Sequence, residues 1–267
     1  MKEAFEFGAN WTRFSLLIND ERIQEAERSL KEFMGVTSLS GKSFLDAGCG
    51  SGIFSLAAQR LGASRVVSFD YDSQCVACVE HLKKTHDPQG LSWTIQSGSV
   101  LDTDFLKSLG QFDVVYSWGV LHHTGAMWQA LRNVLPLVRP HGSLYIAIYN
   151  DQDGTSRRWT LVKKLYNRCP KLLRGFILVP SFVYCWGPIF LHDLLKYKNP
   201  FYTWIHYSSR RGMSAWITLV DWVGGYPFEV AKPEQIFDFY RQNGFVLEKL
   251  KTCGGGLGCN EYLFQKI

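Results

Sequence analysis

The stretch that most constrains this chain is residues 42–63, which read KSFLDAGCGSGIFSLAAQRLGA. A short apolar strand leads through a turn containing Gly48, Gly50 and Gly52 into an apolar helix. Glycines allow positive φ angles and a close approach of backbone to ligand, while amides at a helix N-terminus face whatever is bound. The stretch therefore predicts a strand, a ligand-binding turn and a helix, although a glycine turn alone does not identify the ligand.

The same alternation of strand and helix continues along the chain. Further strands are predicted at residues 64–72, 91–99, 112–119, 142–150, 245–252 and 260–267. A leading helix is predicted from Asp20 to Met34, where apolar residues recur at helical spacing until Gly35 ends the pattern. Strands that alternate with helices form a parallel sheet covered on both faces, so the predicted fold class is α/β and doubly wound.

Between residues 151 and 232 this alternation stops. From Arg157 to Gly212 the chain carries eleven Lys or Arg residues against one acid, so this segment holds +10 while a net charge of +5 leaves −5 for the remainder. The segment also contains twelve aromatic residues. We therefore divide the chain into a core at residues 1–150, a basic, aromatic and helical insertion at residues 151–232, and a final helix and strand pair at residues 233–267 that completes the core.

The insertion contains sixteen consecutive uncharged residues, Phe176 to Leu191. They are fewer than the roughly 20 that span a bilayer, and Pro180, Gly187 and Pro188 are expected to interrupt a spanning helix. Three interpretations stay open: a buried lid over an acceptor pocket, an interfacial element that contacts lipid headgroups, or a basic aromatic surface for RNA. The basic residues assigned to the lipid or RNA contact are Lys163, Lys164, Lys171, Arg174, Lys196 and Lys198.

The seven cysteines show no framework spacing and fit reduced thiols better than disulfides. Cys75 and Cys78 form a CxxC pair, but no second pair or nearby His completes a zinc site, so we predict an apolar helix face and no metal. The N-terminal residues show no apolar run of a signal peptide. These features predict a cytoplasmic protein, with membrane association left open by the insertion.

A carboxylate after the second strand adds the specificity that the glycine turn lacks. Asp70 closes that strand, where it can accept hydrogen bonds from both ribose hydroxyls of a nucleoside. The dinucleotide fingerprint GxGxxG would need glycine at Ile53, so a nicotinamide or flavin fits less well. The segments LDAGCGSG, FDYD, GSVLD and FDVVYSWGVLHHTG resemble, in this order, the motifs of the class I S-adenosylmethionine (SAM) dependent methyltransferases.

This resemblance covers about residues 40–150 and 230–267. It implies a Rossmann-like, mostly parallel seven-stranded sheet with an antiparallel last strand, and SAM as the cofactor. It also implies that Asp46 and the glycine turn hold the methionine end, Asp70 the ribose, and Ser99 the adenine border. Many relatives carry an acid in place of Ser99, so a backbone group or Asp102 is expected to meet the adenine amino group. The predicted cofactor-binding residues are Asp46, Gly48, Gly50, Gly52, Asp70, Tyr71, Ser99, Val100, Ser117 and Trp118.

Methyl transfer from a sulfonium is an in-line displacement, so an enzyme mainly positions the acceptor and excludes water. A general base helps where the acceptor is a hydroxyl or an acidic carbon, and histidine has a suitable pKa. Two histidines follow the fourth strand, and the DWVGGYPFE segment precedes the last helix. Packing within the turn is the alternative role for each histidine. The predicted catalytic residues are His122, His123, Asp221, Tyr226 and Glu229.

The turn after the fourth strand reads SWGV, which lacks the Asn or Asp, prolines and aromatic typical of enzymes that methylate base amines or glutamine. A Pro-Cys nucleophile for RNA cytosine chemistry is also missing, because Cys169 precedes Pro170. The sequence therefore predicts a metal-independent SAM methyltransferase acting on oxygen or carbon of a small, lipophilic acceptor. The alternatives are an RNA methyltransferase that uses the insertion, and a SAM-binding protein without transferase activity.

Overall fold

A computed structural model describes residues 5–87, 92–209 and 211–267. The strands are β1 (Ser43–Ala47), β2 (Arg65–Asp70), β3 (Trp93–Ser97), β4 (Phe112–Trp118), β5 (Val138–Tyr149), β6 (Phe245–Lys251) and β7 (Cys259–Lys266). The core helices are α2 (Asp20–Met34), α3 (Ile53–Arg60), α4 (Ser73–His86), α5 (Thr103–Leu109), α6 (Met127–Val134) and α11 (Pro233–Gln242). The remaining helices are α1 (Phe7–Ser15), α7 (Gly154–Arg168), α8 (Gly175–Tyr197), α9 (Tyr202–Ile205) and α10 (Ala215–Gly224), with short 3₁₀ turns at Leu121–His123, Leu135–Leu137, Lys171–Leu173 and Tyr207–Ser209.

The seven strands form one sheet in the order β3-β2-β1-β4-β5-β7-β6. The pairs from β3 through β5 are parallel, and β7 runs antiparallel to both of its neighbours. Helices α2, α3 and α4 bury apolar side chains against one face, and α5, α6 and α11 cover the other. The predicted doubly wound, mostly parallel sheet with an antiparallel last strand is confirmed.

The predicted leading helix is confirmed as α2, with Asn19 as its cap and Gly35 in the left-handed conformation at its end. The third strand is shorter than predicted, because it begins at Trp93; Leu91, the first residue of the predicted strand, lies outside the described residues. Helix α1 was not predicted. Its sequence, FGANWTRFS, mixes Gly, Asn and Thr with aromatics, and it packs on α4 and α10 instead of standing alone.

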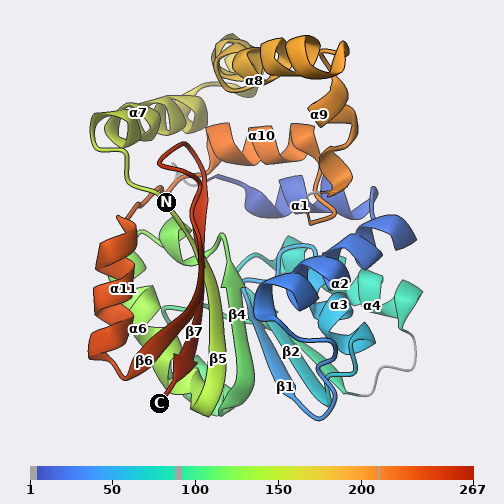
Figure 1. The fold of residues 1–267 in the computed structure, drawn as a ribbon, viewed down its shortest axis with the longest axis vertical. Coiled ribbons are helices and arrows are strands. Elements are labelled where there is room, and N and C mark those ends of the chain that lie inside the picture. Colours follow the sequence, from blue (N-terminus) through green and yellow to red (C-terminus); the bar gives the residue numbers. More distant parts are fainter. Residues whose placement is uncertain (1–4, 88–91, 210) are drawn as a thin grey trace.

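Helices α7 to α10 lie beyond one end of the sheet together with α1 (Figure 1). α10 lies between α8 and the sheet, and α8 forms the outermost layer. Trp159, Trp186, Leu219 and Val223 belong to the separate apolar core of this region, which stands apart from the two cores against the sheet. The insertion is therefore helical, as predicted, and builds its own small core.

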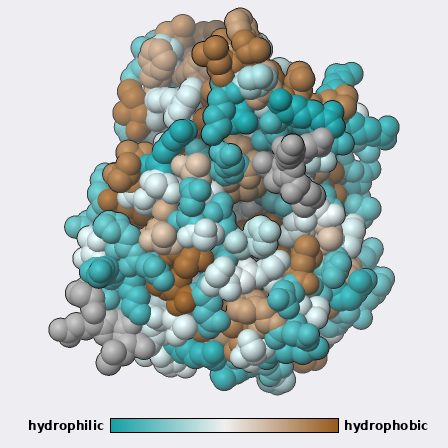
Figure 2. Space-filling model, turned by 180° about the vertical axis from the view of Figure 1, so that it is seen from behind, coloured by the Kyte–Doolittle hydropathy of each residue, from teal (hydrophilic) through white to brown (hydrophobic). Residues whose placement is uncertain are grey.

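Two expectations for the uncharged run are wrong. Pro180 and Pro188 do not interrupt the helix, because both lie inside the 23-residue α8. The run is not a buried lid either, since Phe176 is 79% exposed, Val179 is 62% exposed and Val183 is 59% exposed. Figure 2 shows apolar residues gathered at this end of the molecule. Within the described residues, the stretch Lys171–Tyr197 is long and apolar enough to cross a membrane, which for a single helix is weak evidence of a span.

Candidate active site

The glycine turn lies between β1 and α3, where the sequence predicted it. Gly48, Gly50 and Gly52 have φ angles of 83°, 54° and 78°, in the left-handed region that favours glycine. A side chain at Gly48 would begin 2.4 Å from Val120, and one at Gly50 would begin 3.0 Å from the Trp11 ring. The turn is therefore held close to the segment after β4 on one side and to α1 on the other.

Asp70 ends β2 and faces the glycine turn. One carboxylate oxygen accepts a hydrogen bond from the amide of Gly50 (3.0 Å), and the other accepts one from the amide of Asp72 (2.9 Å). Burial raises the pKa of Asp70, and these two hydrogen bonds lower it. An ionised carboxylate offers about four acceptor positions, and the Cys75 thiol also interacts with this one, so the positions not used by these protein groups remain for a ligand. Asp72 caps α4 by accepting from the amide of Gln74 (2.9 Å).

Asp46 is almost fully buried, with 2% of its surface exposed. Its carboxylate accepts a hydrogen bond from the Ser55 hydroxyl (2.6 Å), which in turn accepts one from Ser68 (2.7 Å). Burial raises the pKa of Asp46 to about 7. One oxygen of Asp46 thus stabilises the start of α3, and only the other is left for the methionine end of a cofactor.

The other predicted cofactor residues lie at the ends of β2, β3 and β4. Ser99 and Val100 follow β3, and the Ser99 hydroxyl accepts from the amide of Leu101 (3.1 Å). Ser117 is buried and donates to the Ala47 carbonyl (2.8 Å), so it links β4 to β1. Trp118 ends β4 and donates to Glu261 (3.1 Å). Tyr71 is 84% exposed, which makes it the predicted cofactor residue least enclosed by protein.

Helix α1 covers the glycine turn and was absent from the predicted site. The amide of Gly8 donates to Asp72 (2.9 Å), and the Trp11 ring lies against Gly50. On its other side, the Asn10 side chain donates to Asp221 (2.6 Å). The signal that could have pointed to α1 is the GANW segment, whose aromatic and amide side chains are unusual for a solvated N-terminal tail.

The two histidines after β4 lie in an aromatic cluster that we define as His122, His123, Tyr149, Trp222 and Phe228. The His122 ring centroid is 4.0 Å from that of Tyr149, which in turn is 5.0 Å from that of Trp222 and 5.2 Å from that of Phe228. Neither ring nitrogen of His122 has a hydrogen-bond partner of normal geometry, whereas His123 Nδ1 contacts the Pro227 carbonyl (2.6 Å). Tyr149, the last residue of β5, therefore lies at the centre of the cluster.

Burial lowers the pKa of both histidines. The pKa of His123 falls to about 3, and that of His122 falls well below its ordinary value, helped in both cases by the nearby positive charge of Lys163. Both imidazoles are therefore neutral at pH 7 and can exchange hydrogen bonds with a ligand. Both side chains are therefore weaker bases than a histidine with an ordinary pKa, which was the basis for predicting a general base here.

Asp221 lies on α10 beside this cluster. Burial raises its pKa to about 7, and the Asn10 hydrogen bond and the charge of Lys163 lower it. A carboxylate that titrates near pH 7 is suited to proton transfer.

Lys163 is fully buried on α7, donates to the Trp222 carbonyl, and lies 4.5 Å from the Phe228 ring. Its predicted contact with lipid or RNA is therefore wrong, since the side chain points into the insertion core.

The remaining two predicted catalytic residues have other partners. Both carboxylate oxygens of Glu229 accept from the amide of Met127 (3.0 and 3.1 Å), which is the first residue of α6. This contact caps α6. Tyr226 lies with its ring 5.6 Å from the Lys164 ammonium, and its carbonyl accepts from the amide of Phe5 (2.9 Å). Catalytic roles for Glu229 and Tyr226 stay predictions.

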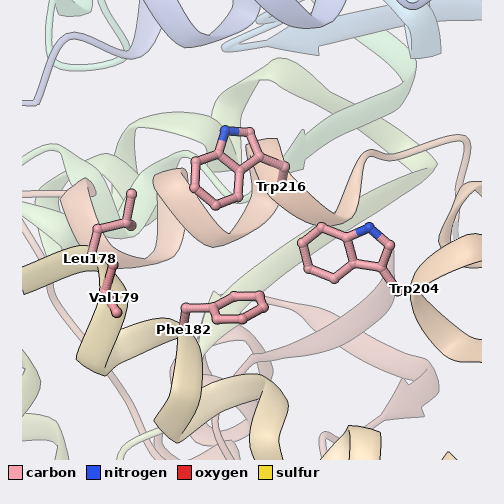
Figure 3. A pocket seen from close by; sticks show the side chains of 5 residues that line it. All are labelled: Leu178, Val179, Phe182, Trp204 and Trp216. Carbon is pink, nitrogen blue, oxygen red and sulfur yellow. The ribbon is translucent and has the colours of Figure 1, made fainter. Parts of the chain in front are cut away.

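An apolar hollow of about 170 Å³ lies between α8, α9 and α10. Figure 3 shows that Trp216 comes from α10, whereas Leu178, Val179 and Phe182 come from α8. Trp216 and Asp221 are five residues apart on α10, which places them on opposite sides of the helix. The hollow is therefore separate from the glycine turn and the aromatic cluster.

The residues around the glycine turn fit a SAM molecule. Asp70 keeps acceptor positions for ribose hydroxyls at the end of β2. Beside the turn, two buried nitrogens of Arg211 have no hydrogen-bond partner, and the arginine lies over the Trp118 ring (3.7 Å to the centroid). A ligand with vicinal hydroxyls at one end and a carboxylate at the other would satisfy both sites.

The sheet order and the glycine turn followed by a strand-end acid define the class I SAM-dependent methyltransferase architecture. Comparison with protein families agrees, because the methyltransferase domain family matches residues 19–218, which is more than half of the chain. The chain therefore belongs to the methyltransferase domain family, and SAM is the cofactor of this class.

Curated relatives match parts of the chain. The ribosomal protein L11 methyltransferase of Thermotoga maritima is 40% identical over 79 residues, covering 29% of this chain and 26% of that protein. The ubiquinone biosynthesis O-methyltransferase of Rhodopseudomonas palustris is 28% identical over 184 residues, covering 68% of this chain and 62% of that protein. The chain thus spans less than two thirds of either relative.

A solved structure shares the fold along most of the chain. The magnesium protoporphyrin IX methyltransferase of Synechocystis, determined with bound S-adenosylhomocysteine (SAH), aligns with a TM-score of 0.55 and 15% identity. The alignment covers 92% of this chain and 84% of that one. At this identity the similarity establishes the fold, and the acceptor has to be argued from the site.

Proposed function

We propose that this protein is a cytoplasmic enzyme that transfers the methyl group of SAM to an oxygen or carbon atom of a small, lipophilic acceptor. The observation that carries the proposal is the aromatic cluster beside Asp221, in which Tyr149 contacts His122, Trp222 and Phe228. Aromatic rings offer broad apolar surfaces on which planar, apolar ligands pack. The Rhodopseudomonas relative is named an O-methyltransferase of ubiquinone biosynthesis, which supports an oxygen acceptor.

The side chains divide the work of positioning the acceptor and moving its proton. When bound, SAM supplies an activated methyl group. Asp221 is the proposed general base, because its pKa of about 7 leaves it partly ionised and still basic at neutral pH. The ring nitrogens of His122 have no hydrogen-bond partner of normal geometry, so they are proposed to orient the acceptor. Trp11 and α1 cover the turn, which supports exclusion of water during transfer.

The proposal does not require a metal ion. Within the part of the chain that the structure describes, no group of three or more His, Cys, Asp or Glu side chains could hold one. Cys75 and Cys78 are buried on α4, where both contribute to an apolar face. Positioning and a carboxylate base are therefore the chemical resources that this chain offers.

Incubation with radiolabelled SAM tests the acceptor class. Purified protein would be mixed with fractionated lipid-soluble metabolites, RNA and protein, and transferred label would be counted in each fraction. Label in the lipid-soluble fraction supports the proposal. Label in RNA would favour an RNA methyltransferase, and binding of SAM without label transfer would favour a SAM-binding protein that lacks activity.

A second proposal concerns where the enzyme acts, and it rests on α8. The exposed side of this helix carries Phe176, Val179, Val183 and Leu191, each at least 59% exposed. Basic residues stand at both ends of the helix, namely Lys171, Arg174, Lys196 and Lys198. An apolar helix face with basic ends favours an anionic lipid surface, where each basic residue contributes about 1 kcal/mol. We propose peripheral contact through this face.

Vesicle co-sedimentation tests the α8 proposal. We expect stronger binding to anionic than to neutral vesicles, with part of the binding surviving high salt because apolar burial is not screened. Val179→Asp with Val183→Asp should abolish the salt-resistant part, whereas the matched change Leu16→Asp, on an exposed residue after α1, should not. Binding to RNA that disappears at high salt, or self-association of the protein without vesicle binding, would contradict the proposal.

A further inference from the structure

Arg211 reaches the rim of the glycine turn from the insertion. It precedes α10, and its side chain is 13% exposed. The guanidinium carbon lies 3.7 Å from the ring centroid of Trp118 and 4.5 Å from that of Phe54. Trp118 ends β4, and Phe54 is the second residue of α3, directly after the turn. The positive charge is therefore placed at the carboxyl ends of the strands, close enough to Asp46 to affect that carboxyl group.

The hydrogen bonds of Arg211 are incomplete. Nη2 donates to the Tyr116 hydroxyl, but Nε and Nη1 are buried without a hydrogen-bond partner. The nearest acid, Glu261, is 3.6 Å from Nη1, which is too long for a hydrogen bond. Glu261 also accepts from Trp118 and Tyr145 and pairs with Lys251. Unpaired buried donors are costly, so this arrangement favours an acceptor supplied by a ligand.

Helix α2 fixes the position of Arg211. Arg22 donates to the carbonyls of Gly212 and Met213, the second at 2.7 Å. Arg28 donates to the Ser209 carbonyl (3.3 Å) on the other side. A side chain at Gly212 would lie 2.6 Å from the Arg22 carbonyl, so the turn packs directly on α2. The donors of Arg211 are thus preorganised by a core helix.

We infer that Arg211 binds the carboxylate at the methionine end of the cofactor. A planar guanidinium matches a carboxylate in shape and charge, and one partner would satisfy its free N–H groups. In the same proposal Asp70, at the end of β2, binds the ribose at the opposite end of the cofactor. The inference rests on the proposed SAM cofactor and assigns an insertion residue to the binding of that cofactor.

Calorimetry with two ligands tests the inference without measuring turnover. The ligands are SAH and its decarboxylated analogue, which differ only in the carboxylate. We expect the full-length protein to bind SAH about 10- to 100-fold more tightly than the analogue, as a charge-assisted contact predicts. Arg211→Gln should remove this preference by weakening SAH alone, and Arg211→Lys should restore part of it.

Lys251→Gln is the matched control, since Lys251 also pairs with Glu261 but is 67% exposed at the side chain. It should leave the preference for SAH unchanged. The inference would be overturned if Arg211→Gln and Arg211→Lys lost affinity for both ligands equally. It would also be overturned if either folded variant kept the full preference for SAH. If the unmodified protein bound neither ligand, the result would instead contradict the cofactor assignment.

Discussion

Lys163 provides a direct test of how the insertion is packed. Its ammonium group is fully buried, donates to the Trp222 carbonyl, and lies 4.4 Å from the Trp222 ring. Trp222 is in the last turn of α10, whose carbonyls lack partners within the helix. Asn167, one turn along α7, donates to the Gly224 carbonyl (2.7 Å). Lys163 and Asn167 therefore cap α10 from a neighbouring helix.

The buried position of Lys163 has a calculable cost. Burial lowers its pKa from 10.5 to about 7, while Asp221 raises it. This change corresponds to roughly 5 kcal/mol if it were fully realised. Between pH 7 and 10.5 the unfolded chain holds a proton on Lys163 and the folded chain does not, so the free energy of unfolding rises with pH in this range. Below about pH 7 the folded and unfolded chains both hold that proton, and the contribution is constant.

The change Lys163→Met removes the titrating group and keeps a similar volume. It leaves the Trp222 carbonyl unpaired, which costs about 1 to 3 kcal/mol. At pH 7 we expect the variant to be more stable than the unmodified protein by at most about 2 to 4 kcal/mol, the difference between the two effects, because the variant also loses the attraction between Lys163 and Asp221. By pH 10 this advantage should disappear, because only the unmodified protein gains stability with rising pH.

Urea unfolding followed by tryptophan fluorescence at pH 6 to 10 measures both curves. Lys164→Met is the matched control, because Lys164 is the next residue of α7 and is only partly buried. Its free energy of unfolding should run parallel to that of the unmodified protein. If the Lys163→Met curve also runs parallel between pH 7 and 10, then Lys163 is not a buried, neutral lysine and the packing argument fails.

Three further results are expected. Asp70→Ala should weaken SAM binding by about tenfold to more than a hundredfold in calorimetry, through loss of charge-assisted hydrogen bonds, and an unchanged Kd would refute the ribose assignment. Gly50→Val should abolish SAM binding, because Trp11 and the positive φ leave no room for a branched side chain; normal binding would make the turn merely structural. Turnover should rise with pH through about 7 as Asp221 ionises, and Asp221→Asn should lower kcat by about 10²- to 10⁴-fold and flatten that profile; an unchanged profile would exclude Asp221 as the base.

The sequence predicted those parts of the fold that depend on local pattern. The strand, glycine turn and helix from Ser43 to Arg60 follow from apolar periodicity and from three glycines in the left-handed conformation. Asp70 could be placed because it directly ends a recognisable strand. The histidines after β4 were located correctly, but their low pKa values could not be predicted, since these come from burial beneath residues distant in the chain.

The parts that sequence reasoning missed depend on long-range packing. Lys163 resembles any other basic residue in a charged segment, and its burial results from the approach of α10 to α7. Likewise, nothing in the segment around Arg211 indicates that α2 fixes the adjacent turn. Pro180 and Pro188 were expected to break the helix, yet α8 tolerates both where its residues are largely exposed.

Helix α1 connects the two halves of the candidate site. Its Gly8 amide contacts Asp72 beside the cofactor strand, and Trp11 lies against Gly50. One residue before Trp11, Asn10 holds the carboxylate of Asp221 on α10 and also donates to the Ile217 carbonyl (3.2 Å). A shift of α1 would therefore alter both the cover of the glycine turn and the orientation of the proposed base.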